Sequence, residues 1–361
     1  MASGSKKIKK LPPIPGTKPS THNAQLFIST GIPSLDHVIG GGLPIGSIFL
    51  IEEDKYGNYA NTMLKYFIAE GIVVSHDNFI ASRGTKTGQL LSEIPEVATD
   101  TPKEMKNDDR DEMKIAWRYQ NLKIIDTSPS GSHKFGHFFD LTKFMDRKKI
   151  DETRVTEWNG ENLRFKSTGF KKQEYVDLLK SIEETISNGQ FYVSNCPEKR
   201  NILRITIRSL GSWLWMCDDP EETKSDLFKF IYCFRALLRN SYAVAAITFP
   251  GHLYSDKDAV IERLEHLSDT VVKLESFAGS DKETNVVFKD YHGLLHIKKL
   301  SAFNTLVSHC PHSTDLAFKL RRKKFLIEVL HIPPELGDTT EREQDEVSCG
   351  GGSSKRSVLD F

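Results

Sequence analysis

The chain has 361 residues, and its 49 Lys and Arg are balanced by 49 Asp and Glu. A formal net charge of zero excludes a protein whose whole surface attracts nucleic acid, so any such contact must come from local basic clusters. The sequence contains no run of about 18 apolar residues and no signal-peptide pattern, and we expect no membrane segment. The five cysteines are odd in number and form no CxxC pair, which predicts reduced thiols, as in a cytosolic or nuclear protein.

The composition divides the chain into a central globular region and two tails. Residues 1–24 are rich in Lys, Pro and Thr, and residues 337–361 are acidic and then rich in Gly and Ser, so both are expected to be disordered. Residues 25–336 predict one α/β domain. Two charged stretches with weak periodicity, 85–111 and 144–172, are expected to be surface insertions in that domain.

Inside the central region, apolar runs typical of strands alternate with amphipathic stretches typical of helices. The expected strands are 47–51, 78–82, 203–207, 243–249 and 270–274, followed by shorter ones at 285–289, 294–300 and 325–330. The expected helices are 61–69, 220–239 and 257–267. Repeated strand–helix–strand units predict a doubly wound, mainly parallel sheet, and the final run of short strands predicts an antiparallel edge.

The clearest helix signal covers residues 220–239. Asp218 or Asp219 can accept a hydrogen bond from its first free N–H groups, and Pro220 suits the first turn. Apolar residues then recur at i, i+3, i+4 and i+7 spacing from Leu227 to Leu238, which predicts one buried face.

Residues 40–67 have the layout of a P-loop, which is a strand, a loop and a helix, but lack its chemistry. A working P-loop reads GxxxxGK[ST]: backbone N–H groups surround the phosphates, the Lys meets the β- and γ-phosphates, and the hydroxyl holds Mg²⁺. When the helix is aligned on its apolar residues, the Lys position falls near Ala60 and the Ser/Thr position near Asn61. Neither residue can perform the required role.

Charge at the same site also argues against nucleotide hydrolysis. The loop places Glu52, Glu53 and Asp54 where phosphate would lie, which repels an anion, and Lys55 is the only nearby cation. An ATPase also needs an apolar strand that ends in a metal-binding Asp, and the candidate strand 203–207 is followed by Arg208. We therefore expect no metal, no cofactor and no catalytic residue in this chain.

Two histidine-containing clusters are weaker candidates for a metal site. His133 and His137 form one, and His309, Cys310 and His312 form the other. Because neither has the second pair of ligands that a structural zinc site requires, we expect structural or surface residues.

Basic runs occur at residues 6–10 and at Arg321, Arg322, Lys323 and Lys324. The second run lies just before an expected strand, so it is either a solvated turn or a contact to a phosphate backbone, which salt dependence would reveal. Tyr56 and Tyr59, in the altered loop, are equally suited to stacking on bases and to packing at a subunit interface.

Four segments together resemble one family, the Elongator complex protein 4 family, which is the fourth subunit of that complex. They are residues 31–72, Met113–Asn121 (MKIAWRYQN), Phe135–Met145 (FGHFFDLTKFM) and Arg321–Leu336 (RRKKFLIEVLHIPPEL). The phrases IEEDKY after GGGL and KIAWRY are far more specific than a general P-loop pattern. The resemblance extends from about residue 25 to residue 336.

The resemblance implies a RecA-like fold without a working P-loop and a heterohexameric ring with the fifth and sixth subunits. It implies that this ring binds tRNA and joins catalytic and scaffold subunits in the cytoplasm and nucleus. That complex modifies wobble uridines, leading to carboxymethyl-, methoxycarbonylmethyl- and carbamoylmethyl-uridine. The chain itself would be a non-catalytic accessory subunit, and a nucleotide at the ring's interfaces stays open.

Three other readings remain open at this point. The chain could be an active RecA-type ATPase that relies on Lys55, a recombinase paralogue that acts on DNA, or a scaffold without nucleic-acid contacts. Our own hypothesis for the altered loop, residues 52–59, is a contact with an adjacent subunit, because the crevice at the carboxyl ends of the strands carries charges suited to salt bridges.

Overall fold

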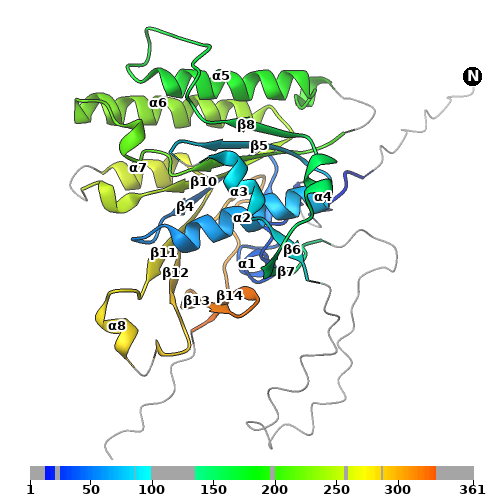
Figure 1. Ribbon diagram of the computed structural model, residues 1–361, viewed down its shortest axis with the longest axis vertical. Helices are drawn as coiled ribbons and strands as arrows, with labels where there is room; N and C mark the ends of the chain where they lie inside the picture. Colours follow the sequence, from blue (N-terminus) through cyan, green and yellow to red (C-terminus); the bar gives the residue numbers. More distant parts are fainter. Residues whose placement is uncertain are drawn as a thin grey trace, which may run out of the picture. The chain divides into compact units, whose positions relative to one another are not determined.

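The computed structural model describes residues 13–20, 25–84, 86–98, 135–195, 200–255, 259–285 and 288–330, and a nine-stranded sheet forms the centre of this part (Figure 1). From edge to edge the strands are β14 (Lys324–Val329), β13 (Leu316–Arg321), β12 (Gly293–Lys299), β11 (Thr270–Ser276), β4 (Ile48–Glu52), β10 (Ala243–Phe249), β9 (Leu203–Arg208), β5 (Asp77–Ser82) and β8 (Val155–Trp158). Strands β11 to β8 are parallel, and β12, β13 and β14 are antiparallel. The expected α/β class is therefore confirmed, and the order β11-β4-β10-β9-β5 is that of a RecA-like sheet.

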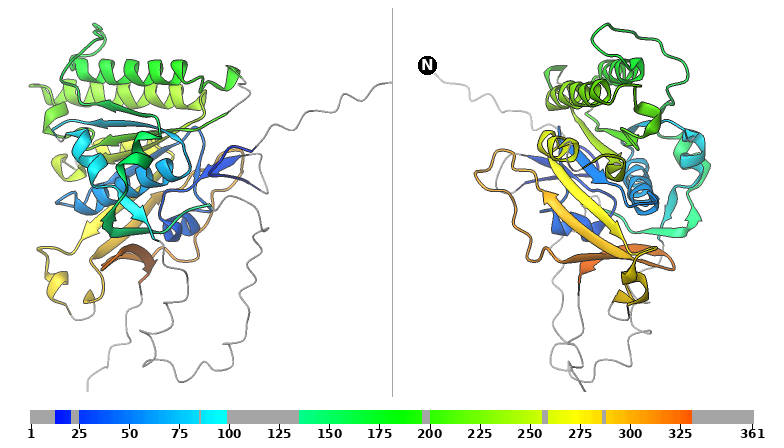
Figure 2. Two further views of the ribbon diagram at one scale, coloured as in Figure 1. Left: turned by 45° about the vertical axis from the view of Figure 1, so that its right-hand side comes forward. Right: turned by 90° about the vertical axis from the view of Figure 1, so that its left-hand side faces the viewer.

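Helices cover both faces of this sheet (Figure 2). Helix α2 (Asn58–Val73) lies on one face, and α5 (Gln173–Asn188), α6 (Pro220–Arg239) and α7 (Val260–Leu267) lie on the other. Shorter helices are α1 (Pro33–Val38), α3 (Thr87–Ser92), α4 (Arg147–Asp151) and α8 (Asp281–Thr284). Two small antiparallel sheets complete the description, one of β1 (Thr17–Pro19), β2 (Leu26–Ile28) and β3 (Leu43–Pro44), the other of β6 (Pro95–Val97) and β7 (Phe139–Phe144).

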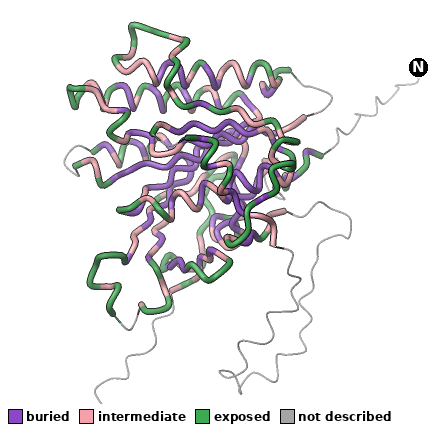
Figure 3. Tube along the Cα trace, viewed as in Figure 1, coloured by how far each residue is buried: buried purple, intermediate pink, exposed green. Residues whose placement is uncertain are grey.

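Alternation along the central strands builds two apolar cores (Figure 3). In β4, Phe49 and Ile51 belong to the cluster that contains α2, whereas Ile48 and Leu50 belong to the cluster that contains α6. Successive side chains of a strand point to opposite faces, so a strand buried on both faces reads as a continuous apolar run. Each fully buried side chain of this size contributes about 1.5–3 kcal/mol.

The sequence identified most of the described elements of the central sheet, with one strand expected wrongly and two missed, β13 and β8. The expected strand 285–289 is wrong in its described part, because Phe288 and Lys289 lie in a turn; residues 286–287 are outside the described residues. Strand β13 was missed because its last residue runs into the basic stretch that we interpreted as a single cluster. That stretch is the turn of a hairpin, in which Arg321 pairs with Lys324.

Helix boundaries were anticipated unevenly. Helix α6 has the expected bounds, and Asp219 rather than Asp218 accepts the N–H of Glu221 at 3.0 Å. Helix α2 begins three residues before the expected position and extends to Val73. Helix α5 was missed because we interpreted the preceding charged segment as a long insertion.

The two expected insertions contain regular structure. Within 144–172, strand β8 pairs in parallel with β5 and forms an edge of the central sheet. Trp158, whose side chain is 7% exposed, holds it there by stacking on Trp215 at 5.7 Å between ring centres. Within 85–111, the described residues form α3 and β6. Residues 99–134, which contain the motif at Met113–Asn121, and the C-terminal tail lie outside the described residues. Of the expected disordered tail 1–24, residues 13–20 are described and contain β1, which pairs with β2, so that expectation is wrong in this part.

Among the described helices, none combines the length and apolar character needed to cross a bilayer.

Candidate functional site

The loop between β4 and α2 lies at the carboxyl ends of the parallel strands, which is where open α/β sheets bind ligands. A pocket of about 250 Å³ opens there, lined by the loop and by the turns that follow β9 and β10. Its lining includes Glu53, Lys55, Asn61 and Arg208, four of the residues singled out in the sequence. The structure thus brings the altered loop and the end of the expected metal strand together.

Because α2 starts earlier than expected, the P-loop motif aligns with other residues than those expected from the sequence. Gly57 has a left-handed φ of 67° and precedes the first helical residue, Asn58. Counted from this glycine, the Lys position of a P-loop corresponds to Asn58 and the Ser/Thr position to Tyr59. We expected these positions near Ala60 and Asn61; Ala60 is fully buried in the core, and Asn61 lines the pocket. In neither register does the Lys position carry an ammonium group. The only hydroxyl at a Ser/Thr position is the phenol of Tyr59, whose ring packs against Phe318 and does not line the pocket.

The carboxylate of Asp54 occupies the N-terminus of α2. Its Oδ1 atom accepts the backbone N–H groups of Tyr59 at 3.1 Å and Ala60 at 3.3 Å. The side chain is 2% exposed, and its Oδ2 atom has no hydrogen-bond partner among the described residues. Free N–H groups and the helix dipole make a helix N-terminus an anion site, which in a P-loop receives phosphate. Here the chain supplies its own anion.

The other two loop carboxylates have separate partners. Glu52 is buried and forms an ion pair with Lys273 at 2.8 Å. Glu53 accepts a hydrogen bond from the Ser209 hydroxyl at 2.7 Å and lines the pocket. Ser209 has a left-handed φ of 47°, a conformation that is unfavourable for a residue with a Cβ. Of the two glutamates, Glu53 is the one that lines the pocket.

The cations of the site do not replace the missing lysine. Lys55 is exposed, and its amino group lies 5.6 Å from the centre of the Tyr56 ring. Arg208 lines this pocket and a neighbouring one that also contains Glu93. The pKa of Glu93 is lowered, chiefly by hydrogen bonds from Lys65 and Gln89, with a smaller contribution from the Arg208 charge. The end of β9 thus brings a cation, and not a carboxylate, to this pocket.

The two loop tyrosines differ in their surroundings. Tyr59 packs inside the protein against Phe318, with ring centres 4.6 Å apart. Tyr56 remains 56% exposed and lines the pocket, as does Trp213, which is 71% exposed. Only Tyr56 is thus available to a partner.

The basic run lies on the turn of the β13–β14 hairpin. Arg321, Arg322 and Lys323 are exposed, and Lys324 is half-buried. The carbonyl of Lys323 accepts the N–H of Leu141 at 2.8 Å, so the turn is held against β7. The position fits both readings of the sequence, a solvated turn and a phosphate contact.

The candidate zinc clusters are not assembled in the described residues, where no group of three or more His, Cys, Asp and Glu could hold a metal ion. His309, Cys310 and His312 lie in the exposed connection between β12 and β13, and His133 is outside the described residues. His137 instead contacts Glu70, with 3.1 Å between Nδ1 and Oε1. Cys217, Cys233 and Cys310 are free thiols, as expected.

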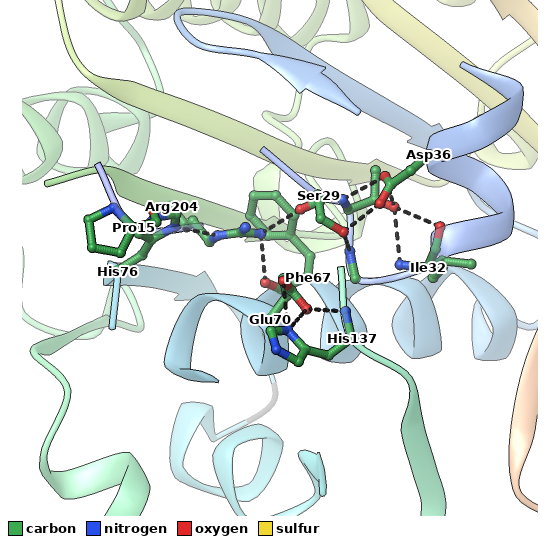
Figure 4. Close-up of polar contacts among 11 residues, drawn as sticks. Pro15, Ser29, Ile32, Asp36, Phe67, Glu70, His76, His137 and Arg204 are labelled. Carbon is green, nitrogen blue, oxygen red and sulfur yellow. Dashed lines mark hydrogen bonds and ion pairs between the residues drawn. The ribbon is translucent and has the colours of Figure 1, made fainter. Parts of the chain in front are cut away.

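A buried cluster of charged residues was not anticipated (Figure 4). Arg204 of β9 is fully buried and donates to Nδ1 of His76 at 3.1 Å and to the carbonyls of Ser29 and Phe67 at 3.0 and 3.1 Å. Glu70 of α2, also buried, accepts the N–H of His137 at 3.0 Å.

The same cluster includes a carboxyl group at the start of α1. Asp36 accepts the N–H and hydroxyl of Thr30, at 2.8 and 2.7 Å, and the hydroxyl of Ser29. Burial raises its pKa to about 6 despite these hydrogen bonds. The sequence did contain a signal for this cluster, which is a charged residue inside an apolar run: Arg204 in LRITI and Glu70 in YFIAEGI. Such a residue is retained in a core only when it has hydrogen-bond or charge partners, so the two runs indicate a buried polar cluster.

The fold and the site together define a class of protein: a RecA-like α/β domain in which the loop after the first parallel strand caps the next helix with its own carboxylate. By sequence, the chain belongs to the PAXNEB protein family, whose model matches residues 10–361.

Relatives cover most of the chain. Elongator complex protein 4 of Xenopus laevis is 42% identical over 391 residues, which cover 98% of this chain and 93% of that protein. The protein of the same name from Homo sapiens is 43% identical over 356 residues, covering 92% and 83%. Among solved structures, the KaiC-like protein PH0186 of Pyrococcus horikoshii OT3 matches 84% of this chain and 98% of its own, at 14% identity and a TM-score of 0.45. The family expected from the sequence is confirmed.

Proposed function

We propose that this chain is an accessory, non-catalytic subunit of an Elongator complex. Its identity to proteins named Elongator complex protein 4 supports membership of that complex. The observation that carries the non-catalytic role is the Asp54 carboxylate at the N-terminus of α2, where a phosphate would have to bind. Arg208 at the position of the metal ligand supports the same role.

The finer proposal is that the chain assembles with the fifth and sixth subunits into a heterohexameric ring that binds tRNA. The ring would support modification of wobble uridines to carboxymethyl-, methoxycarbonylmethyl- and carbamoylmethyl-uridine by the catalytic subunit, in the cytoplasm and nucleus. Exposed Tyr56 and Trp213 beside Glu53 support a subunit contact at the pocket, since aromatic residues are enriched in interfaces.

Assembly is tested by co-expressing the three subunits and measuring the mass of the purified complex. A heterohexamer supports the proposal, and monomeric chain in the presence of both partners contradicts it. ATP hydrolysis by the complex, compared with Lys55→Ala, separates the accessory role from the competing ATPase: hydrolysis that is lost in Lys55→Ala would establish an active site in this chain.

The basic residues of the hairpin turn are the proposed tRNA contacts, namely Arg321, Arg322, Lys323 and Lys324. Neutralising the first two should weaken tRNA binding by the complex and reduce its dependence on salt, because each phosphate contact releases counterions. Unchanged affinity and salt slope would favour a scaffold without nucleic-acid contacts. Tighter binding of single-stranded DNA than of tRNA at equal salt would favour the recombinase alternative.

A further inference from the structure

Strand β7 forms an exposed strip beside the basic hairpin. The N–H of Leu141, in the middle of β7, donates to the carbonyl of Lys323 in the hairpin turn at 2.8 Å. The strand carries its buried residues, Phe139 and Asp140, at its beginning, and its last three residues are exposed. Figure 1 places β7 next to β14 and away from the helices α5 and α6.

Basic side chains from two distant parts of the sequence meet on this strip. The pKa of the Asp140 carboxyl is lowered chiefly by a hydrogen bond from Thr142, and the charges of Lys323 and Lys143 add to this effect, so both lysines lie near one carboxylate. Asp140 is buried and accepts the N–H and hydroxyl of Thr142 at 2.9 and 2.6 Å. Its carboxylate is thus engaged within β7 by Thr142, with the charges of Lys323 and Lys143 close to it.

Further basic residues lie on both elements that the hydrogen bond between Leu141 and Lys323 joins, the hairpin and the segment that follows β7. Arg321 and Arg322 are exposed on the hairpin, and Arg147 and Lys148 are exposed on α4, directly after β7. Asp146, which precedes them, is occupied in capping α4 and accepts the N–H of Lys148 at 3.1 Å.

Two aromatic rings are exposed on the same strip. The side chain of Phe138 is 54% exposed, and the amino group of Lys324 lies 5.4 Å from the centre of its ring. The side chain of Phe144 is 64% exposed, at the other end of β7 and next to Lys143. Exposed phenylalanine is unfavourable in water, and basic residues interleaved with aromatic ones are typical of surfaces that bind single-stranded nucleic acid.

We propose that this strip binds an unpaired segment of RNA, whose bases stack on Phe138 and Phe144 while its phosphates contact the basic residues of the hairpin and of β7. The proposal rests on the RNA contact proposed above for the hairpin and assigns it to unpaired nucleotides. The two phenylalanines are six positions apart along the chain, which is a span of about 20 Å in extended conformation. A duplex hides its base faces within the stack, so it can use the charges of the strip but not its rings.

The test measures binding of the full-length chain to a short oligoribonucleotide that contains 2-aminopurine, and to a duplex of the same length at the same salt. The wild-type chain should bind the single strand more tightly and quench the fluorescence of the stacked base. Phe138→Ala and Phe144→Ala should each weaken single-strand binding about fivefold or more, abolish quenching at the affected base, and leave duplex binding unchanged. Both side chains are more than half exposed, so these variants should remain folded.

The control variant is Tyr232→Ala, which removes an aromatic side chain that is 67% exposed on α6. It should bind both RNAs as the wild type does. The paired Arg321→Gln and Arg322→Gln substitutions should weaken binding of single strand and duplex alike, since they act on phosphates.

Different failures of this test have different meanings. If both phenylalanine variants bind single strands like the wild type while the arginine variant does not, stacking is excluded and the hairpin contact stands. If the arginine variant also binds like the wild type, the proposed RNA contact fails as well. Tighter binding of single-stranded DNA than of RNA would also overturn the assignment. So would displacement of the RNA by poly-glutamate to the same extent from the wild type and from both phenylalanine variants.

Discussion

Asp54, in the loop between β4 and α2, occupies the N-terminus of α2 with its own carboxylate. It lies four residues before the helix and reaches back to the N–H groups of Tyr59 and Ala60, a position that Gly57 permits by adopting a left-handed φ of 67°. A carboxylate at this position interacts favourably with the dipole of α2 whether or not a ligand is present, whereas a phosphate would do so only when bound. The same carboxylate therefore stabilises the start of α2.

Replacing Asp54 with Ala should lower the free energy of unfolding by about 0.5–2 kcal/mol, because two N–H groups at the start of α2 lose their acceptor. Urea denaturation followed by circular dichroism measures the change. Glu183→Ala, which removes an exposed carboxylate on α5 that pairs with Lys180, is the matched control and should change stability by less. Equal effects of the two substitutions would contradict the role given to Asp54.

His76 should make stability depend on pH. Burial and then the charge of Arg204 lower its pKa from 6.5 to about 3, so the folded state binds fewer protons than the unfolded state between these values. The contribution of His76 to stability therefore rises with pH across that window, and it is lost on acidification. Asp36 acts in the opposite sense, because burial raises its pKa from 3.8 to about 6.

In His76→Asn this contribution is absent while that of Asp36 remains. The difference in unfolding free energy between wild type and variant should consequently grow as the pH rises through that window, as measured by urea denaturation at several pH values. A difference that stays constant with pH would show that His76 does not titrate in this way.

At the scale of elements, the β13–β14 hairpin closes one edge of the central sheet. Edge strands expose N–H groups that can pair with other chains. In β14 the N–H of Phe325 donates to the hydroxyl of Tyr66 at 3.1 Å, and the N–H of Ile327 donates to the hydroxyl of Ser34 at 3.3 Å. Side chains of α2 and α1 thus cover the edge that the antiparallel strands would otherwise leave open.

Tyr66→Phe and Ser34→Ala, made together, should lower stability by about 1–3 kcal/mol, since each leaves a backbone donor without its acceptor. They should also increase self-association on mild heating, which light scattering detects. Tyr232→Phe on the exposed face of α6 is the matched control. A double variant as stable and as monodisperse as this control would argue against a protected edge.

The elements that the sequence predicted correctly are those in which the pattern of apolar residues is not interrupted by charged residues. Continuous apolar runs such as Ala243–Phe249 and the capped stripe of α6 were sufficient to predict their elements. Strand β13 ends in a charged stretch, and helix α5 follows one. Which of their faces is buried is determined only by the neighbouring elements in the folded protein. The positions of Glu53 and Arg208 around one pocket followed from the strand–loop–helix pattern, whereas the cluster around Arg204 depends on tertiary contacts that no local pattern contains.

At the scale of the whole molecule, the pocket at the carboxyl ends of the strands is the proposed contact with a neighbouring subunit. Glu52 is engaged inside the protein by Lys273, so reversing its charge would disturb the fold rather than an interface. Glu53, held by Ser209 at the pocket wall, is the better probe of assembly.

Glu53→Lys should weaken assembly with the fifth and sixth subunits about tenfold or more while changing thermal stability little, because a like-charge contact at an interface costs several kcal/mol. Analytical ultracentrifugation of the co-expressed subunits measures it, with Glu183→Lys on α5 as control. Assembly of Glu53→Lys at the affinity of the control would remove this pocket from the interface.

The central claim is that the anion site of the loop is already filled. Isothermal titration of the full-length chain with Mg²⁺ and ATP tests it most directly, with Asp54→Ala measured alongside. We predict no saturable binding to the wild-type chain at millimolar ATP. Saturable binding to the wild-type chain that is lost in Lys55→Ala would contradict the claim, because the loop would then hold phosphate in spite of its own carboxylate.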